Sequence, residues 1–335
     1  MTYLRHYKHS RVQKLLPLNK PGRQSGAALM ALVLVLFISA SAVMVRELNV
    51  RVGFQETDLQ TRQEMINAKE MLIAYASNFA ELNSSGLGPG RLPCWDYTND
   101  GEPDDSSCAT QYTYRLPEYT DIEVGDTFRF NEEYADIGQQ FWYALTPAYR
   151  DTGVLGLNSS TSGNLTIDGE SGYVAVVIAP GPAVTNQDRS EAETWANNYY
   201  GLTNYLEGDN GTLYTTDFEN AISADSDYYN DVVLGITHSE IMTPVTSRVV
   251  REMKTSLDNF HPHPYFGDSY PSTASGWGVY LAYYFGAAWF NNDNWELVAK
   301  YNQVSADVAT ISFTGCSIIY TVEFGGGITR DRNSC

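Results

Sequence analysis

The sequence predicts an α+β protein in which a long N-terminal helix, residues 27–80, packs on an antiparallel β-sheet body with long loops. Residues 27–45 contain no charged side chain, so the first half of this helix is apolar. From Arg46 to Phe79 apolar residues recur at helical spacing among charged ones, which predicts an amphipathic second half. Apolar runs between Gly- and Pro-rich stretches predict the strands of the body, at 172–179, 231–237, 295–299 and 308–324.

The uncharged segment has the length of a membrane span. At 1.5 Å per residue, residues 27–45 would extend about 28 Å, close to the thickness of the hydrocarbon core of a bilayer. The preceding residues 1–26 contain six Lys or Arg and no acidic residue, which favours a cytoplasmic N-terminus. The alternative is a secretory signal peptide cleaved near Ala42.

The start of this segment resembles a known processing site. Gln24-Ser25-Gly26 followed by Ala27-Ala28-Leu29-Met30, after a basic leader, is similar to the cleavage site of type IV prepilins and pseudopilins. The resemblance implies that a prepilin peptidase cuts between Gly26 and Ala27 and methylates Ala27. Most pilins carry Glu at the fifth mature position, whereas this chain has Ala31. That departure favours a minor pilin or a tip pseudopilin.

This resemblance implies a pilin-like structural subunit, not an enzyme, that assembles through its N-terminal helix. The filament would be a bacterial type IV pilus or a type II secretion-like filament. The expected order is a removed leader at 1–26, a helix at 27–80 and an extracytoplasmic globular domain at 81–335. We expect a single-pass inner-membrane protein that later enters an extracytoplasmic filament. The implied partners are other pilin or pseudopilin subunits, the prepilin peptidase and the inner-membrane assembly machinery.

Two other classes of function stay open at this point. One is a pilus-tip adhesin, because many Tyr and Trp side chains are available to contact a surface or a sugar. The other is a membrane-tethered extracytoplasmic enzyme that acts on glycans, although no catalytic residues are evident in the sequence. The formal net charge of −19 disfavours nucleic acid as a partner. His261 and His263 form a metal-ligand pair in principle, but the adjacent prolines favour a surface loop.

An acidic segment, DYTNDGEPDD, is the candidate metal site. Its hard oxygen donors alternate along the chain, and a Gly allows a sharp turn, as a Ca²⁺ loop requires. Ser107 stands where an EF-hand has a bidentate Glu, so an ordinary EF-hand is excluded. The alternative is a solvated acidic turn. The candidate ligands are Asp96, Thr98, Asp100, Glu102, Asp104 and Asp105.

Four cysteines in an exported chain predict two disulfides, with three possible pairings, and free thiols are the alternative. Sequential pairing would join Cys94 to Cys108 and Cys316 to Cys335. The second pair resembles the C-terminal disulfide loop of type IV pilins. Closing loops of this length would add about 3 kcal/mol of stability per bridge.

Further short motifs resemble a group of prepilin-like bacterial proteins but imply no chemistry. They are GRLPC at 90–94, APGPAV with Gln187 and Arg189, NYLEG at 204–208, and the Asn-Asp pair at 230–231. The spacing of apolar residues also predicts a helix over 242–260. Residues 138–149 are predicted to form a short helix or a buried aromatic segment.

Overall fold

A computed structural model describes residues 59–83, 85–104, 113–121, 127–130, 140–152, 156–185, 187–189, 198–221, 228–260, 269–272, 287–331 and 333–335. The chain divides into two units, Met1–Leu59 and Gln60–Cys335, and the second contains nearly all of the described residues. Residues 27–45, predicted to span the membrane, lie outside the described ranges. So does the predicted cleavage site at Gly26 and Ala27.

The described part of the N-terminal helix covers residues 59–82 and has one buried face. Apolar side chains on that face recur every three or four residues, as expected for a helix that packs along one stripe. The charged side chains of this helix, among them Arg62, Lys69 and Glu70, lie outside that stripe, so the helix is amphipathic. The buried side chains are Met65, Ala68, Leu72, Tyr75, Ala76 and Phe79.

The second long helix, α3 (His238–Phe260), lies beside residues 59–82. It begins with a capping box, in which the Thr237 amide donates to Glu240 Oε2 at 2.9 Å and the Glu240 amide donates to Thr237 Oγ1 at 3.3 Å. Lys69 forms an ion pair with Glu240 at 2.7 Å, and Arg248 pairs with Glu81 further along both helices. From the first ion pair to the second, the residue numbers increase along both helices. The two helices are therefore parallel. The predicted helix over 242–260 is confirmed.

Strand β6 (Glu170–Ala179) is the centre of the larger sheet. Over residues 175–179 it pairs antiparallel with β4 (Trp142–Leu145) on one edge and with β8 (Val232–Thr237) on the other. The sheet is completed by β1 (Thr113–Arg115), β5 (Leu165–Ile167) and β7 (Asp217–Phe218). The predictions of strands at 172–179 and 231–237 are confirmed. Residues 142–145 form a buried strand, and η2 (Pro147–Tyr149) is a short 3-10 helix.

Both faces of β6 are covered, which explains why its sequence is apolar without alternation. Ala175, Val177 and Ala179 belong to the large core that includes the two long helices. Val176 and Ile178 face a second, smaller core. That core contains side chains from α2 (Asn198–Tyr205), which covers the opposite face of the sheet.

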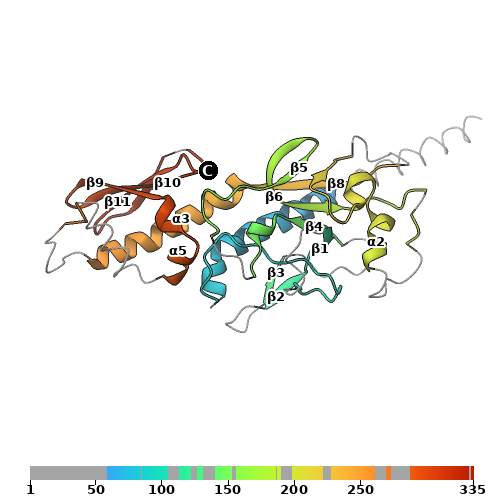
Figure 1. Cartoon of the computed structure of the whole chain (residues 1–335), viewed down its shortest axis with the longest axis horizontal. Coiled ribbons are helices and arrows are strands. Elements are labelled where there is room, and N and C mark those ends of the chain that lie inside the picture. Colours follow the sequence, from blue (N-terminus) through green and yellow to red (C-terminus); the bar gives the residue numbers. More distant parts are fainter. Residues whose placement is uncertain are drawn as a thin grey trace, which may run out of the picture. The chain divides into compact units, whose positions relative to one another are not determined.

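A separate four-stranded antiparallel sheet follows, in the order β12-β11-β10-β9. In Figure 1, α3 extends from the region of β6 and β8 to this C-terminal sheet. Buried side chains alternate with half-buried ones along β10 and with more exposed ones along β11, so one face of the sheet is solvated. The remaining elements are η3 (Gly208–Gly211), α5 (Ala288–Asn292), α6 (Trp295–Val298), β9 (Ala299–Ser305), β10 (Val308–Phe313), β11 (Ile319–Glu323), β12 (Ile328–Arg330), and the hairpin of β2 (Tyr119–Asp121) and β3 (Thr127–Arg129).

The structure contradicts the predicted fold class. The body is not one antiparallel sheet, because its larger sheet is mixed and the C-terminal sheet is separate. The parallel pair joins β5 to β7, with Thr166 opposite Asp217 and Ile167 opposite Phe218. A parallel pair needs a long crossover, here the chain through β6, α2 and η3, and apolar alternation does not reveal such a connection. Residues 295–298, predicted as a strand, are helical.

The predicted localisation, a single-pass inner-membrane protein that moves into an extracytoplasmic filament, is also contradicted. Within the ranges that the structure describes, no helix combines the length and the apolar character needed to cross a bilayer. The described part of the N-terminal helix carries Arg62, Glu64, Lys69 and Glu70, whose charges oppose insertion.

A buried ion pair joins the loop after the N-terminal helix to the C-terminal part of the chain. Arg91 Nη2 donates to Asp293 Oδ1 at 2.6 Å, and both side chains are 0% exposed. Arg91 Nη1 also donates to the Arg150 carbonyl at 3.1 Å. Asp293 accepts the amide protons of Gly88 at 2.7 Å and Gly156 at 3.1 Å. Burial raises the pKa of Asp293, while the Arg91 charge opposes that rise.

Replacing Asp293 with Asn should lower the free energy of unfolding by about 3–5 kcal/mol, because it leaves the Arg91 guanidinium buried without a counter-charge. The double variant Arg91→Met with Asp293→Leu should recover part of that loss. Urea unfolding followed by circular dichroism measures both changes. The exposed control Glu70→Gln should change stability by less than about 0.5 kcal/mol. A loss below about 1 kcal/mol in Asp293→Asn would show that the pair is not a structural anchor.

Candidate functional site

The structure brings three of the short sequence motifs into one group of buried and half-buried polar side chains. We call this group the polar cluster and define it as Gln187, Arg189, Glu207, Asn210 and Asp231. Its residues come from the loop after β6, from the end of α2 through η3, and from the residue that precedes β8. These three motifs, which are separate in the sequence, therefore contact one another in the fold.

Glu207 and Asp231 cap each other's backbone. Glu207 Oε2 accepts the amide protons of Asn230 at 3.0 Å and Asp231 at 3.2 Å. In return Asp231 Oδ2 accepts the Glu207 amide proton at 2.9 Å. Asn210 Nδ2 donates to the same Asp231 oxygen at 3.1 Å. This reciprocal arrangement fixes the segment after α2 against the start of β8.

Arg189 fastens the loop after β6 to α2. Its guanidinium donates to the carbonyls of Asn204 at 2.8 Å, Gly181 at 2.8 Å and Tyr205 at 3.1 Å. It also donates to Gln187 Oε1 at 2.6 Å, and Gln187 Nε2 in turn donates to Glu207 at 2.6 Å. Burial lowers the pKa of Arg189, and the negative charge of Glu207 opposes that effect.

Gly181 leaves room for this packing. A Cβ at Gly181 would lie 2.2 Å from Asn230 Oδ1, so any larger residue would displace that amide. Asn230 Nδ2 donates to the Pro182 carbonyl at 2.8 Å. The Pro-Gly-Pro turn after β6 therefore packs against the Asn-Asp pair that precedes β8 and is hydrogen-bonded to it.

The polar cluster has a structural role, in which two carboxyl groups hold one proton and fix the backbone around them. Burial raises the pKa of Asp231 to about 8, and the neighbouring Glu207 charge contributes to the rise. One proton held by this pair of carboxyl groups removes their repulsion at neutral pH. The amide protons donated to each carboxylate keep these groups directed at the backbone.

The acidic segment forms a turn organised by two of its carboxylates. Asp96, which is buried, accepts the amide protons of Asn99 at 2.5 Å, Asp100 at 3.2 Å and Gly101 at 2.8 Å. Asp104 accepts the amide protons of Tyr97 and Thr98 and the Thr98 hydroxyl proton. Burial raises the pKa of Asp96 to about 6, while the donated amide protons lower it.

Calcium binding by this segment stays a prediction. In the described part of the chain, no group of three or more His, Cys, Asp or Glu side chains is placed to hold a metal ion. Asp100 accepts the amide proton of Glu102, and Glu102 accepts the hydroxyl proton of Tyr119. Asp105 lies outside the described residues. Calorimetry of the full chain with Ca²⁺ and with EDTA would measure binding directly.

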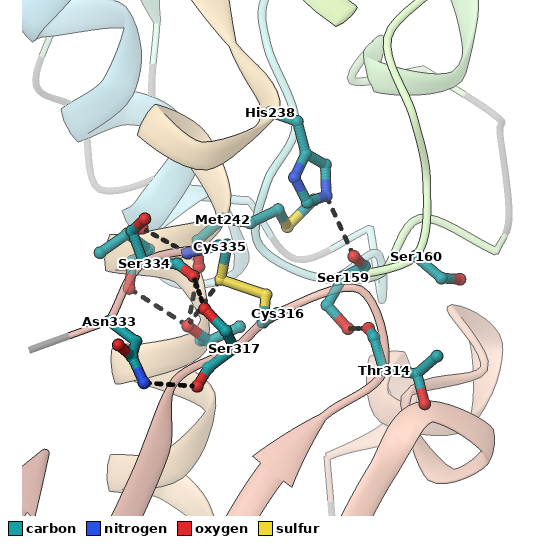
Figure 2. Close-up of a disulfide and its surroundings, with 12 residues drawn as sticks. Ser159, Ser160, His238, Met242, Thr314, Cys316, Ser317, Asn333, Ser334 and Cys335 are labelled. Atoms are coloured by element: carbon teal, nitrogen blue, oxygen red, sulfur yellow. Dashed lines mark hydrogen bonds between the residues drawn. A yellow bond between two sulfur atoms is a disulfide. The ribbon is translucent and has the colours of Figure 1, made fainter. Parts of the chain in front are cut away.

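A disulfide joins Cys316 to Cys335, residues 19 apart in the sequence. Figure 2 shows the C-terminal residues beside the start of α3, and the Cys335 amide donates to Thr243 Oγ1 on that helix at 3.3 Å. Ser317 Oγ donates to the Ser334 carbonyl at 2.7 Å, which closes the same loop. Cys94 is also disulfide-bonded, and its predicted partner Cys108 lies outside the described residues.

His238 is the one histidine within the residues that the structure describes, and its contacts are structural. One ring nitrogen of His238 lies 3.0 Å from the Ser159 carbonyl oxygen, and Ser159 Oγ donates to the Thr314 carbonyl (Figure 2). This chain of contacts joins the start of α3 to the turn after β10. Burial lowers the pKa of His238. His261 and His263 lie outside the described residues.

Reasoning from the sequence found the motifs but missed what they do. It gave no role to Glu207, Asp231 or Arg91, of which Asp231 directly precedes the apolar residues 232–234. That position was the available signal, because a charged side chain next to a buried segment needs a partner.

Comparison with protein-family models, curated proteins and solved structures found no match to this chain.

Replacing Asp231 with Asn should flatten the pH dependence of stability. The raised pKa of folded Asp231 means that its favourable contribution is complete below pH 4 and is lost as the pH rises through about 8. Asn mimics the protonated acid, so the variant should become the more stable protein above pH 8. Chemical unfolding between pH 5 and 9 measures this. The exposed neighbour Asp209→Asn should follow the wild-type curve; parallel curves for D231N would refute the assigned titration.

Replacing Asp96 with Ala should destabilise the turn, because three amide groups lose their acceptor. We expect a loss of about 1–3 kcal/mol in the free energy of unfolding. The control Asp100→Ala removes an exposed carboxylate from the same segment and should cost less than about 0.5 kcal/mol. Equal losses in the two variants would mean that Asp96 does not organise the turn.

Proposed function

We propose that this chain is a pilin-like structural subunit of a filament and that it assembles through its N-terminal helix. The proposal rests on the distribution of apolar side chains around the helix over residues 59–82. One face is buried in the body, and apolar side chains on other faces of the same helix are exposed. The partners in this proposal are other pilin or pseudopilin subunits, and the prepilin peptidase prepares the chain at Gly26.

The exposed apolar side chains support a helix-to-helix contact. Ile66 is 41% exposed and Met71 is 38% exposed, although both stand in a helix whose core contacts are already satisfied by other residues. Leu59 is 70% exposed. Toward the N-terminus the sequence becomes uncharged from residue 45 back to residue 27. We infer that the occupant of this surface is the corresponding helix of a neighbouring subunit, which would bury these side chains.

The body has the properties that a displayed subunit needs. Its helix is fixed to α3 by ion pairs, and the loop that follows the helix is fixed to the C-terminal part of the chain by Arg91 and Asp293. The disulfide at Cys316 and Cys335 prevents the C-terminal residues from separating when the chain is pulled. A helix so attached transmits force from a filament core to the body without unfolding its connection.

Glu substitutions at Ile66 and Met71 should reduce incorporation into filaments at least tenfold, since they place charges where an apolar contact is proposed. The amount of chain that sediments with sheared filaments from cells measures incorporation. The thermal midpoint of each purified variant should stay within a few degrees of the wild type, because both side chains are exposed.

The matched control is Val304→Glu, which makes the same change of an exposed apolar side chain to Glu on β9, outside the proposed contact. It should incorporate normally. Normal incorporation of both the Ile66 and Met71 variants would contradict assembly through this part of the helix, and absence of the wild-type chain from all filaments would contradict the proposed function itself.

A further inference from the structure

A cavity of about 850 Å³ lies between α3 and the C-terminal sheet. This volume is within the range of small-molecule binding sites. One wall is a single face of α3, and the other is formed by β11, β12 and the turn between them. The lining residues are Thr243, Pro244, Ser247, Arg251, Lys254, Tyr320, Gly326, Gly327, Ile328 and Arg330.

Among the residues that the structure describes, the lining contains three cations and no carboxylate, although the whole chain carries 40 acidic and 21 basic residues. Arg251 and Lys254 approach from the helix, and Arg330 approaches from the edge strand β12. At physiological ionic strength charges interact over roughly 8 Å, so distant acidic groups are largely screened from the cavity. Two acidic side chains lie nearby, Asp258 on Lys254 and Glu323 beside Gly326, so the positive charge open to a ligand is that of Arg251 and Arg330.

The two guanidinium groups have capacity for a ligand. Among the described residues, neither Arg251 nor Arg330 has a side-chain hydrogen bond or an ion pair, whereas Lys254 Nζ pairs with Asp258. Glu81 is close enough to Arg251 for the two charges to interact. The pKa of Glu81 is lowered mainly by its hydrogen bond from Arg248, and the Arg251 charge lowers it further. Two planar forks without a fixed partner favour carboxylate or phosphate groups, which match their geometry in bidentate contacts.

The floor of the cavity is held in place. The buried Tyr320 hydroxyl lies 2.8 Å from Thr246 Oγ1 and 3.0 Å from Ser247 Oγ. These contacts tie β11 to α3 next to the disulfide at Cys335. Arg330 is directly opposite Tyr320 in the register of β11 and β12, so the same contacts determine where Arg330 leaves the sheet. The cavity is thus a formed feature of two rigid elements.

We propose that this cavity binds a small ligand with two or more carboxylate or phosphate groups, and that Arg251 and Arg330 are its anion-binding residues. Lys254 adds positive charge at the same wall. Pro244 and Ile328 offer a limited apolar surface to the carbon skeleton of the ligand. This binding activity does not depend on the proposed filament function.

Isothermal titration calorimetry of the full chain with pyrophosphate and with citrate tests the proposal and separates phosphate from carboxylate ligands. We expect saturable binding of at least one of them with a stoichiometry near one. Arg251→Ala and Arg330→Ala should each weaken it at least tenfold. Arg330→Lys keeps the charge but loses the fork, so it should bind more weakly than the wild type and more tightly than Arg330→Ala.

The matched control is Lys300→Ala, which removes one exposed cation from the same sheet outside the cavity. It should bind within twofold of the wild type, and thermal melting of every variant checks that the fold is retained. Equal weakening by Lys300→Ala would mean that only net charge matters and would overturn the site. Absence of saturable binding of both probes would overturn it too, as would binding of a hexaglutamate peptide alone, which would assign the cavity to an acidic protein partner.

Discussion

The buried contact between Arg91 and Asp293 is the constraint on which the described body depends. It lies where the loop after the N-terminal helix meets the segment between α5 and α6, and both side chains are fully buried. Asp293 also accepts amide protons from Gly88 and Gly156, so one carboxylate holds three stretches of chain together. Because lone buried charges are so unfavourable, these stretches cannot separate one at a time. The Asp293 carboxylate therefore ties the loop after the N-terminal helix and the segment at Gly156 to the segment between α5 and α6.

The polar cluster performs a related task on the other face of the larger sheet. Strand β6 is covered on both faces, and its ends therefore need polar groups that stop the apolar layers and direct the chain into turns. Arg189 and the Glu207–Asp231 pair supply these groups from segments far apart in the sequence. The polar cluster therefore fixes the loop after β6, the end of α2 and the start of β8 to one another.

The sequence predicted those elements whose signal is local. Helix α3 and strands β6 and β8 were predicted because their apolar spacing or continuity lies within a few residues of each position. The parallel pairing of β5 with β7 was not predicted, since it depends on a crossover of some fifty residues between Thr166 and Asp217. The contact of Arg91 with Asp293 spans 202 positions, and no pattern along one sequence identifies such a pair. The helix at 295–298 was missed because an isolated apolar turn has the same composition as a short strand.

The central claim is that the N-terminal helix of this chain is made for assembly with other subunits after prepilin-type processing. Mass spectrometry of the N-terminus of the chain isolated from its native cells tests it most directly. The account predicts a mature N-terminus at Ala27, with one methyl group on its amine and residues 1–26 absent. An intact Met1, or a new N-terminus near Ala42, would contradict it.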